Sequence, residues 1–203
     1  RITMAGDAGA GKTSLIKRLS DQLMDPEQYA TGMLSITEQV TDVAGDDIKI
    51  RFWDFPGNPD YLPLFPIFVK RSLLVILVID SAEDQRVRFW LNYLTVHNPG
   101  RPIIVAINKI DKHSGSTISP LLLKQTYPMA QIIQRISSLN GSSLKQFREH
   151  FDNEIANMDH IADGVLPAYQ AVFNRIREEL SSMMSLEDFE FIAQKDSVGF
   201  NYW

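Results

Sequence analysis

The residues with the clearest chemical meaning lie at positions 6–13, which read Gly-Asp-Ala-Gly-Ala-Gly-Lys-Thr. They match the pattern G-x-x-x-x-G-K-[ST] and stand between a short apolar segment and an amphipathic one, as a phosphate-binding loop requires. In such a loop the backbone N–H groups turn inward around phosphates, Lys12 supplies positive charge, and the Thr13 hydroxyl binds Mg²⁺. The predicted phosphate-binding residues are Gly6, Asp7, Ala8, Gly9, Ala10, Gly11, Lys12, Thr13 and Ser14.

A second candidate motif, Asp-x-x-Gly, begins with Asp54 at the end of a segment that alternates apolar and polar residues. A carboxylate in this place can hold Mg²⁺ beside a triphosphate, and Gly57 leaves a backbone N–H free to approach the γ-phosphate. The motif alone is common at strand-end turns, but its position after the phosphate loop favours a nucleotide site. The predicted metal ligands here are Thr13 and Asp54. The predicted catalytic residues are Lys12, Gly57 and the adjacent Asn58.

The third motif is the run Asn108-Lys109-Ile-Asp111, which follows a buried apolar segment, where ligands bind in parallel sheets. A carboxylate at Asp111 can accept hydrogen bonds from both the N1–H and the N2–H₂ of guanine, whereas adenine has no donor at either position. The site would reject adenine by roughly 10⁴-fold or more, because that carboxylate would stay unpaired. Lys109 would lie along the ring face. Ser138 and Leu139, after the last strand, would offer backbone N–H groups to the guanine O6. The pattern therefore predicts a guanine nucleotide and disfavours an ATPase.

Alternating strands and helices must position these motifs, and they predict an α/β fold with a mostly parallel sheet and helices on both faces. The predicted strands are 2–5, 47–53, 73–79, 103–107 and 131–137, with 34–43 as a further candidate antiparallel to 47–53. The predicted helices are 13–24, one that carries Val87, Trp90, Leu91 and Leu94, one starting at Ser119-Pro120, and one after Ser143. We expect one domain over 1–158, followed over 159–203 by a linker and the truncated start of a helical module.

Taken in this order and spacing, the motifs resemble those of Ras-type GTPases over residues 1 to about 158. More narrowly, the segments 52–58 and 63–80 and the tail 165–195 resemble the Roc domain of Roco proteins and the start of the COR module that follows it. The resemblance implies a six-stranded Ras-like sheet that binds GTP and GDP with Mg²⁺. It also implies a molecular switch that hydrolyses GTP and regulates the other domains of a larger multidomain protein, with a homodimer formed through the C-terminal extension.

One departure from the Ras pattern affects catalysis. Ras-type enzymes usually place Gln after D-x-x-G to orient the attacking water, but this chain has Asn58, one methylene shorter and followed by Pro59. A residue before proline is pushed toward extended conformations, and a displacement of about 1 Å can cost on the order of 10²-fold in rate. We expect a slow GTPase, at or below the roughly 10⁻⁴ s⁻¹ of unassisted Ras. The alternative is a nucleotide-holding interaction or dimerisation module with little or no turnover.

Two segments should respond to the nucleotide, one around Thr31 and one after Asp54, and both depart from the pattern usual in the family. Thr31 is the candidate for the threonine that meets Mg²⁺ and the γ-phosphate, although the spacing usual in the family points to Ala30, and Thr37 is a more distant option. Prolines at 56, 59, 63 and 66 fix φ repeatedly in the segment after Asp54 and predict no regular helix there. This segment would be either a rigid loop docked on the sheet or a stiff lever that passes the nucleotide state to a partner.

The composition of the 203-residue chain is globular and excludes several classes of protein. A formal net charge of −5 gives no general attraction to nucleic acid or anionic lipid. The chain has no cysteine, which excludes thiolate chemistry and fits a reducing compartment. Its longest aliphatic run, 73–79, is far shorter than the roughly 20 residues of a membrane span. We expect a cytoplasmic chain with no transmembrane segment and no nucleic-acid partner, cut from a longer protein because it begins without Met.

Overall fold

A computed structural model of the chain describes residues 1–22, 34–43, 46–113, 115 and 118–158. The chain divides into two compact units, Arg1–Glu154 and Ile155–Trp203, and the first unit contains the sheet and the motifs. Its helices and strands are, in order, β1 (Ile2–Ala5), α1 (Lys12–Leu19), β2 (Ser35–Val43), β3 (Asp46–Asp54), the 3₁₀ turn η1 (Pro59–Tyr61), α2 (Phe65–Val69), β4 (Leu74–Asp80), the 3₁₀ turn η2 (Ser81–Glu83), α3 (Arg86–His97), β5 (Ile103–Asn108), α4 (Pro120–Thr126), β6 (Ala130–Arg135) and α5 (Leu144–Ala156). The C-terminal extension predicted over 159–203 lies outside the described residues.

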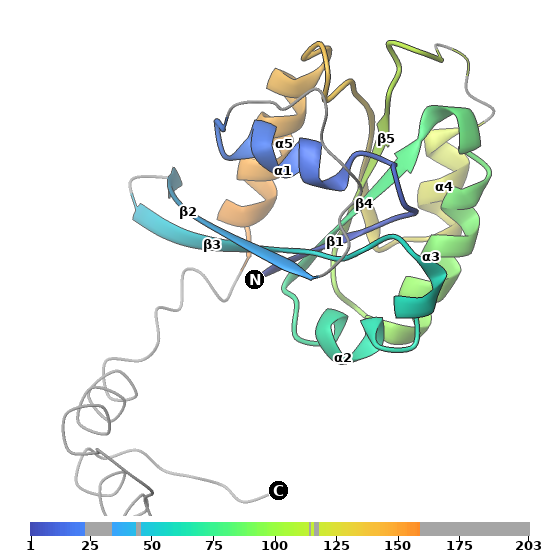
Figure 1. Cartoon of the computed structure of the whole chain (residues 1–203), viewed down its shortest axis with the longest axis horizontal. Coiled ribbons are helices and arrows are strands. Elements are labelled where there is room, and N and C mark those ends of the chain that lie inside the picture. The colour runs from blue at the N-terminus through green and yellow to red at the C-terminus, as the bar shows by residue number, and fades with distance from the viewer. Residues whose placement is uncertain (23–33, 44–45, 114, 116–117, 159–203) are drawn as a thin grey trace, which may run out of the picture. The chain divides into compact units, whose positions relative to one another are not determined.

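The strands form one six-stranded sheet in the order β2-β3-β1-β4-β5-β6. β2 runs antiparallel to β3, and every other neighbouring pair is parallel. The predicted Ras-like sheet is therefore confirmed, and the candidate strand at 34–43 is its antiparallel edge. Because parallel strands end at the same edge, the segments after β1, β3, β4, β5 and β6 meet there, as Figure 1 shows.

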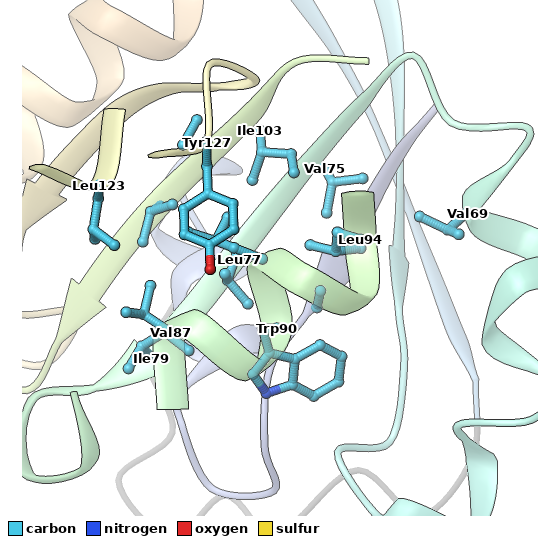
Figure 2. Close-up of a cluster of buried hydrophobic side chains, with 14 of the residues drawn as sticks. Val69, Val75, Leu77, Ile79, Val87, Trp90, Leu94, Ile103, Leu123 and Tyr127 are labelled. Atoms are coloured by element: carbon cyan, nitrogen blue, oxygen red, sulfur yellow. The ribbon is translucent and has the colours of Figure 1, made fainter. Parts of the chain in front are cut away.

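Two helical layers cover the sheet, and the apolar strands supply both interfaces (Figure 1). β4 is buried along nearly its whole length, so its sequence is a continuous apolar run rather than an alternating one. Its residues Val75 and Leu77 belong to a core shared with Trp90 of α3, which Figure 2 shows lying over the sheet. On the opposite face, Phe52 of β3 stacks on Phe151 of α5, with 6.1 Å between the ring centroids.

The proline-rich segment corrects one expectation. The sequence predicts no regular helix there, but a 3₁₀ turn forms at Pro59–Tyr61 and a short α-helix at Phe65–Val69. Pro66 falls in the first turn of α2, where its missing N–H would have no helical partner in any case. The segment packs against α3, since Phe65 is buried against Trp90 and the hydroxyl of Tyr93 donates to the Leu62 carbonyl at 2.7 Å. The segment is therefore docked, with contacts to α3, while its rigidity and a lever function both stay predictions.

The first helix is also shorter than predicted. α1 ends at Leu19, Ser20 follows as its C-cap, and Asp21 has a φ of 52°, which no helix continues through. Residues 23 and 24, the predicted end of the helix, lie outside the described residues. Within the described part of the chain, none of the helices has the length and apolar character needed to cross a bilayer.

Candidate functional site

The phosphate loop connects β1 to α1 and depends on glycine at positions where a side chain has no room. Gly6 has a φ of 132°, and a Cβ there would lie 2.1 Å from the carbonyl oxygen of Val78. Gly11 has a φ of 99° and is the N-cap of α1, so the helix N-terminus points into the loop. A glycine-dependent turn before a helix N-terminus is the geometry expected of the predicted phosphate loop.

Lys12 holds the loop together from inside. Its side chain is only 6% exposed, and its Nζ donates to the carbonyl oxygens of Gly6 at 3.0 Å and Asp7 at 2.9 Å. Burial lowers the pKa of Lys12, while the nearby carboxylates of Asp54 and Asp7 oppose that shift. The result is an ammonium group positioned inside the predicted phosphate loop.

Thr13 and Asp54 meet beside this loop. The Thr13 hydroxyl donates to the Oδ2 of Asp54, which is the last residue of β3 and is 1% exposed. A hydroxyl and a carboxylate are hard oxygen ligands, the donor set that Mg²⁺ requires, and they come together here as the sequence motifs imply. The two residues therefore fit a magnesium ion.

The third predicted metal ligand, Thr31, lies outside the described residues, and so does its alternative Ala30. The more distant option, Thr37, lies within β2 and is paired in register with Phe52. Its backbone is therefore held in the β2–β3 ladder rather than in a loop that could close over a ligand.

Gly57 lies directly against the phosphate loop. Its carbonyl accepts a hydrogen bond from the N–H of Ala8 at 3.1 Å. A Cβ on Gly57 would lie 2.1 Å from the Ala8 nitrogen and 2.2 Å from the carbonyl carbon of Asp7, so only glycine fits. The segment after β3 thus touches the predicted phosphate loop directly.

Asn58 has the extended backbone that the following proline imposes, with φ −72° and ψ 132°. Its side-chain oxygen accepts from the N–H of Asp60 at 3.1 Å, and its amide donates to the Asp60 carboxylate at 3.1 Å. The side chain therefore acts as the cap of the 3₁₀ turn at Pro59–Tyr61.

Asn108 links the phosphate loop to the loop after β6. It is 2% exposed at the end of β5, and its amide nitrogen donates to the Ala10 carbonyl at 2.9 Å. Its amide oxygen accepts from the N–H of Ser138 at 2.9 Å. One side chain thus fixes the spacing between the two predicted ends of a nucleotide site.

Lys109 is held by a partner that the sequence motifs do not single out. Its Nζ donates to the Asp80 carboxylate at 2.6 Å, and its carbonyl accepts from the Ser81 hydroxyl at 3.0 Å. Burial alone would raise the pKa of Asp80, but the bonds from Lys109 and the backbone of Ala82 bring it below its ordinary value. Lys109 has a φ of 65°, and these contacts support that strained backbone.

Asp111 and the loop after β6 form the predicted base-binding end. The Ser137 hydroxyl donates to the Oδ1 of Asp111 and accepts from the N–H of Asn140 at 3.2 Å. Asp111 is exposed, so its carboxylate is accessible to solvent beside this loop. Of the two predicted backbone donors, the Ser138 N–H is engaged by the Asn108 amide. The Arg18 side chain donates to the carbonyls of Ser138, at 2.8 Å, and of Leu139.

Four supporting residues therefore escape sequence reasoning: Arg18, Asp80, Arg86 and Ser137. Asp80 carries a usable signal in the sequence, because it ends an apolar strand run. In the structure it is paired in register with Asn108. Arg86 does not, because nothing in its spacing marks it apart from neighbouring surface arginines. In the structure its guanidinium binds the carboxylate of Asp7 in the phosphate loop, with nitrogen–oxygen distances of 2.8 and 3.0 Å.

The sheet order, with one antiparallel edge strand, and the loops gathered at the carboxyl ends of its strands define a Ras-like P-loop domain of the GTPase class. A sequence profile described as "Roc: Ras of Complex, Roc, domain of DAPkinase" matches residues 1–111. The chain therefore belongs to the Roc family, whose domains occur in Roco proteins.

The chain is also similar to curated Ras-related proteins, in line with its Ras-like fold. The chain is 31% identical over 117 residues to the Ras-related protein Rab-18 of Lymnaea stagnalis, covering 55% of this chain and 58% of that protein. It is 23% identical over 181 residues to RABA5a of Arabidopsis thaliana, covering 89% of this chain and 75% of that protein. The chain thus spans a little over half the length of the Rab-18 relative.

A solved structure resembles the chain over almost its whole length. It is described as the Methanosarcina barkeri Roco2 RocCORdC bound to GDP, with a TM-score of 0.79 and 27% identity. The match covers 98% of this chain and 62% of the other.

Replacement of Asn108 by Ala should lower the free energy of unfolding by about 2–4 kcal/mol. The change leaves the Ala10 carbonyl and the Ser138 N–H without their partner in a buried place. Urea unfolding of the 203-residue chain without added nucleotide measures the effect. Asn153→Ala, on the exposed face of α5, is the matched control and should change stability by less than about 0.5 kcal/mol. Equal effects of the two changes would contradict the bridging role.

Gly57→Ala should destabilise the chain by about 1–3 kcal/mol or more, because the added methyl overlaps the backbone of the phosphate loop. Gly115→Ala is the control, since a Cβ there meets nothing within 4 Å. Thermal unfolding of the two variants side by side provides the comparison. An unchanged midpoint for the Gly57 variant would show that the loop does not lie where the structure places it.

Proposed function

We propose that this chain is a guanine-nucleotide-binding switch domain that binds GTP and GDP with Mg²⁺ and hydrolyses GTP slowly. The observation that supports it most directly is the contact between Ser137 and Asp111, which fixes a carboxylate at the same sheet edge as the phosphate loop. Asn108 hydrogen-bonds both the phosphate loop and the loop after β6, so the proposed base and phosphate ends of the site are tied together.

The base would be recognised by its donors. The Asp111 oxygens accept from the guanine N1–H and N2–H₂, while the Ser137 hydroxyl holds the carboxylate in place. Because the Ser138 N–H is taken by Asn108, the backbone donor for the guanine O6 would be that of Leu139. The stem of Lys109, held at its tip by Asp80, would lie against the ring.

The phosphates would be held by the loop 6–14. Lys12 would exchange its contacts with the loop carbonyls for phosphate oxygens, and its positive charge makes that exchange favourable. Thr13 and Asp54 would hold Mg²⁺, which supplies positive charge to the β- and γ-phosphates when it is bound. Gly57, against Ala8, would offer its backbone N–H to the γ-phosphate.

Hydrolysis would be slow because the residue in the place of the Ras-type Gln is already engaged. Asn58 caps the turn at Pro59–Tyr61 and is directed to Asp60, so its amide is not aimed at an attacking water. The same observation favours the second candidate function, a module that holds a nucleotide for interaction or dimerisation with little or no turnover.

The place of the domain in a larger protein follows from its family. We propose that it regulates other domains of the same protein, as one domain over 1–158 followed by the start of a COR-like module over 159–203. A homodimer through that extension and a cytoplasmic location stay predictions.

Base selectivity tests the proposal. The chain should bind GDP at least about 10³-fold more tightly than ADP, because adenine leaves the carboxylate unpaired. Asp111→Asn should weaken GDP binding by about 10²-fold or more and should bind xanthosine diphosphate in its place, since xanthine carries a carbonyl where guanine carries its amino group. Titration of fluorescent nucleotides measures both. Asp47→Asn is the control, because it removes the same negative charge at an exposed position of β3. Equal affinity of the original chain for GDP and ADP would refute the proposal.

Turnover separates the two candidate functions. A single-turnover assay with excess chain, Mg²⁺ and γ-labelled GTP should give a rate at or below about 10⁻⁴ s⁻¹, and Lys12→Ala should abolish it. Tight binding with no detectable phosphate release would select the nucleotide-holding module. A rate well above that range would contradict the role assigned to Asn58.

A further inference from the structure

Arg86 makes a bidentate ion pair with Asp7 of the phosphate loop. Its Nε and one terminal nitrogen donate to the two carboxylate oxygens of Asp7 at 3.0 and 2.8 Å. Its guanidinium also lies over the Phe89 ring, 4.4 Å from the centroid. Asp7 and Phe89 therefore hold the Arg86 guanidinium in one orientation.

The position of Arg86 is unfavourable without such partners. It is the first residue of α3, and a cation at a helix N-terminus is repelled by the positive end of the helix dipole. The residue before it, Gln85, makes no side-chain cap. The pair with Asp7 offsets this cost and connects α3 to the phosphate loop.

Asp7 brings a negative charge to a place that must accept phosphate. Its own carbonyl binds the Lys12 ammonium at 2.9 Å, and its backbone touches Gly57. Burial alone would raise the pKa of Asp7, but the hydrogen bonds and charge of Arg86, with a smaller effect of the Lys12 charge, hold it below the ordinary value, so the carboxylate stays ionised at neutral pH. An unpaired Asp7 would repel phosphate oxygens and attract the Lys12 charge.

We propose that Arg86 is a positioning residue that neutralises Asp7 and thereby protects the affinity of the phosphate loop for GTP more than for GDP. This inference rests on the proposed guanine-nucleotide binding. GTP carries the additional γ-phosphate charge, and Gly57, the predicted γ-phosphate donor, lies against Asp7. An uncompensated carboxylate in this loop would repel the larger negative charge of GTP more strongly than the smaller charge of GDP.

Four variants of the 203-residue chain test this role: Arg86→Gln, Arg86→Lys, Asp7→Asn/Arg86→Gln and Arg88→Gln. The measurement is the dissociation constant for fluorescent GTP analogue and for fluorescent GDP, each with Mg²⁺. Arg88 is exposed on the same turn of α3, so its replacement changes the net charge equally and serves as the control. Thermal unfolding of each variant runs in parallel.

The expected results form a pattern that a structural role alone would not produce. Arg86→Gln should weaken GTP binding by about tenfold and GDP binding by about threefold or less. The double variant should recover GTP affinity to within about threefold of the original, because the charge that needed neutralising is gone. Arg86→Lys should retain most of the affinity, and Arg88→Gln should show no change.

Each other outcome overturns the inference. If the double variant stays as weak as Arg86→Gln, the arginine contacts phosphate directly rather than masking Asp7. If GTP and GDP weaken equally while the unfolding midpoint falls, the pair only stabilises the fold. If the original chain binds both nucleotides and Arg86→Gln binds them unchanged, the charge of Asp7 has no effect. Failure of the original chain to bind either nucleotide would refute the proposed function itself.

Discussion

The amide of Asn108 is the contact on which the rest of the site depends. It lies at the end of β5 and hydrogen-bonds the phosphate loop with one end and the loop after β6 with the other. Because an amide group has a fixed length, the two loops cannot separate without breaking a buried hydrogen bond. A parallel sheet brings many loops to one edge, but only such a bridge sets the distance between two of them.

Three cations around this bridge have partners before any ligand arrives. Lys12 binds loop carbonyls, Lys109 binds Asp80, and Arg86 binds Asp7. Each of these groups is at least partly shielded from water, where an unpaired charge is costly. These cations are thus paired in the structure, and of the three only Lys12 would exchange its partners for phosphate oxygens in the proposed complex.

Most of the fold and the positions of the motifs can be predicted from the sequence because both follow from local patterns. The buried run of β4, the alternation of β3 and the glycine spacing of the phosphate loop are visible without coordinates. The pairings that orient the motifs are not predictable in this way, because Arg86 and Asp7, or Ser137 and Asp111, are far apart in the chain and ordinary in type. The helix at Phe65–Val69 escapes prediction for another reason: proline breaks a helix interior, but it is compatible with a first turn, and the sequence does not say which of the two applies.

The contact between Gly57 and Ala8 has a consequence for how this site can be regulated. With no Cβ at position 57, the two main chains touch directly and no rotamer lies between them. A side chain could absorb a small displacement by turning about its own bonds, and here no such side chain lies between the two main chains. Gly57 is therefore the point at which the predicted lever would act, because a shift of the segment after β3 toward the phosphate loop meets its backbone with no side chain between them.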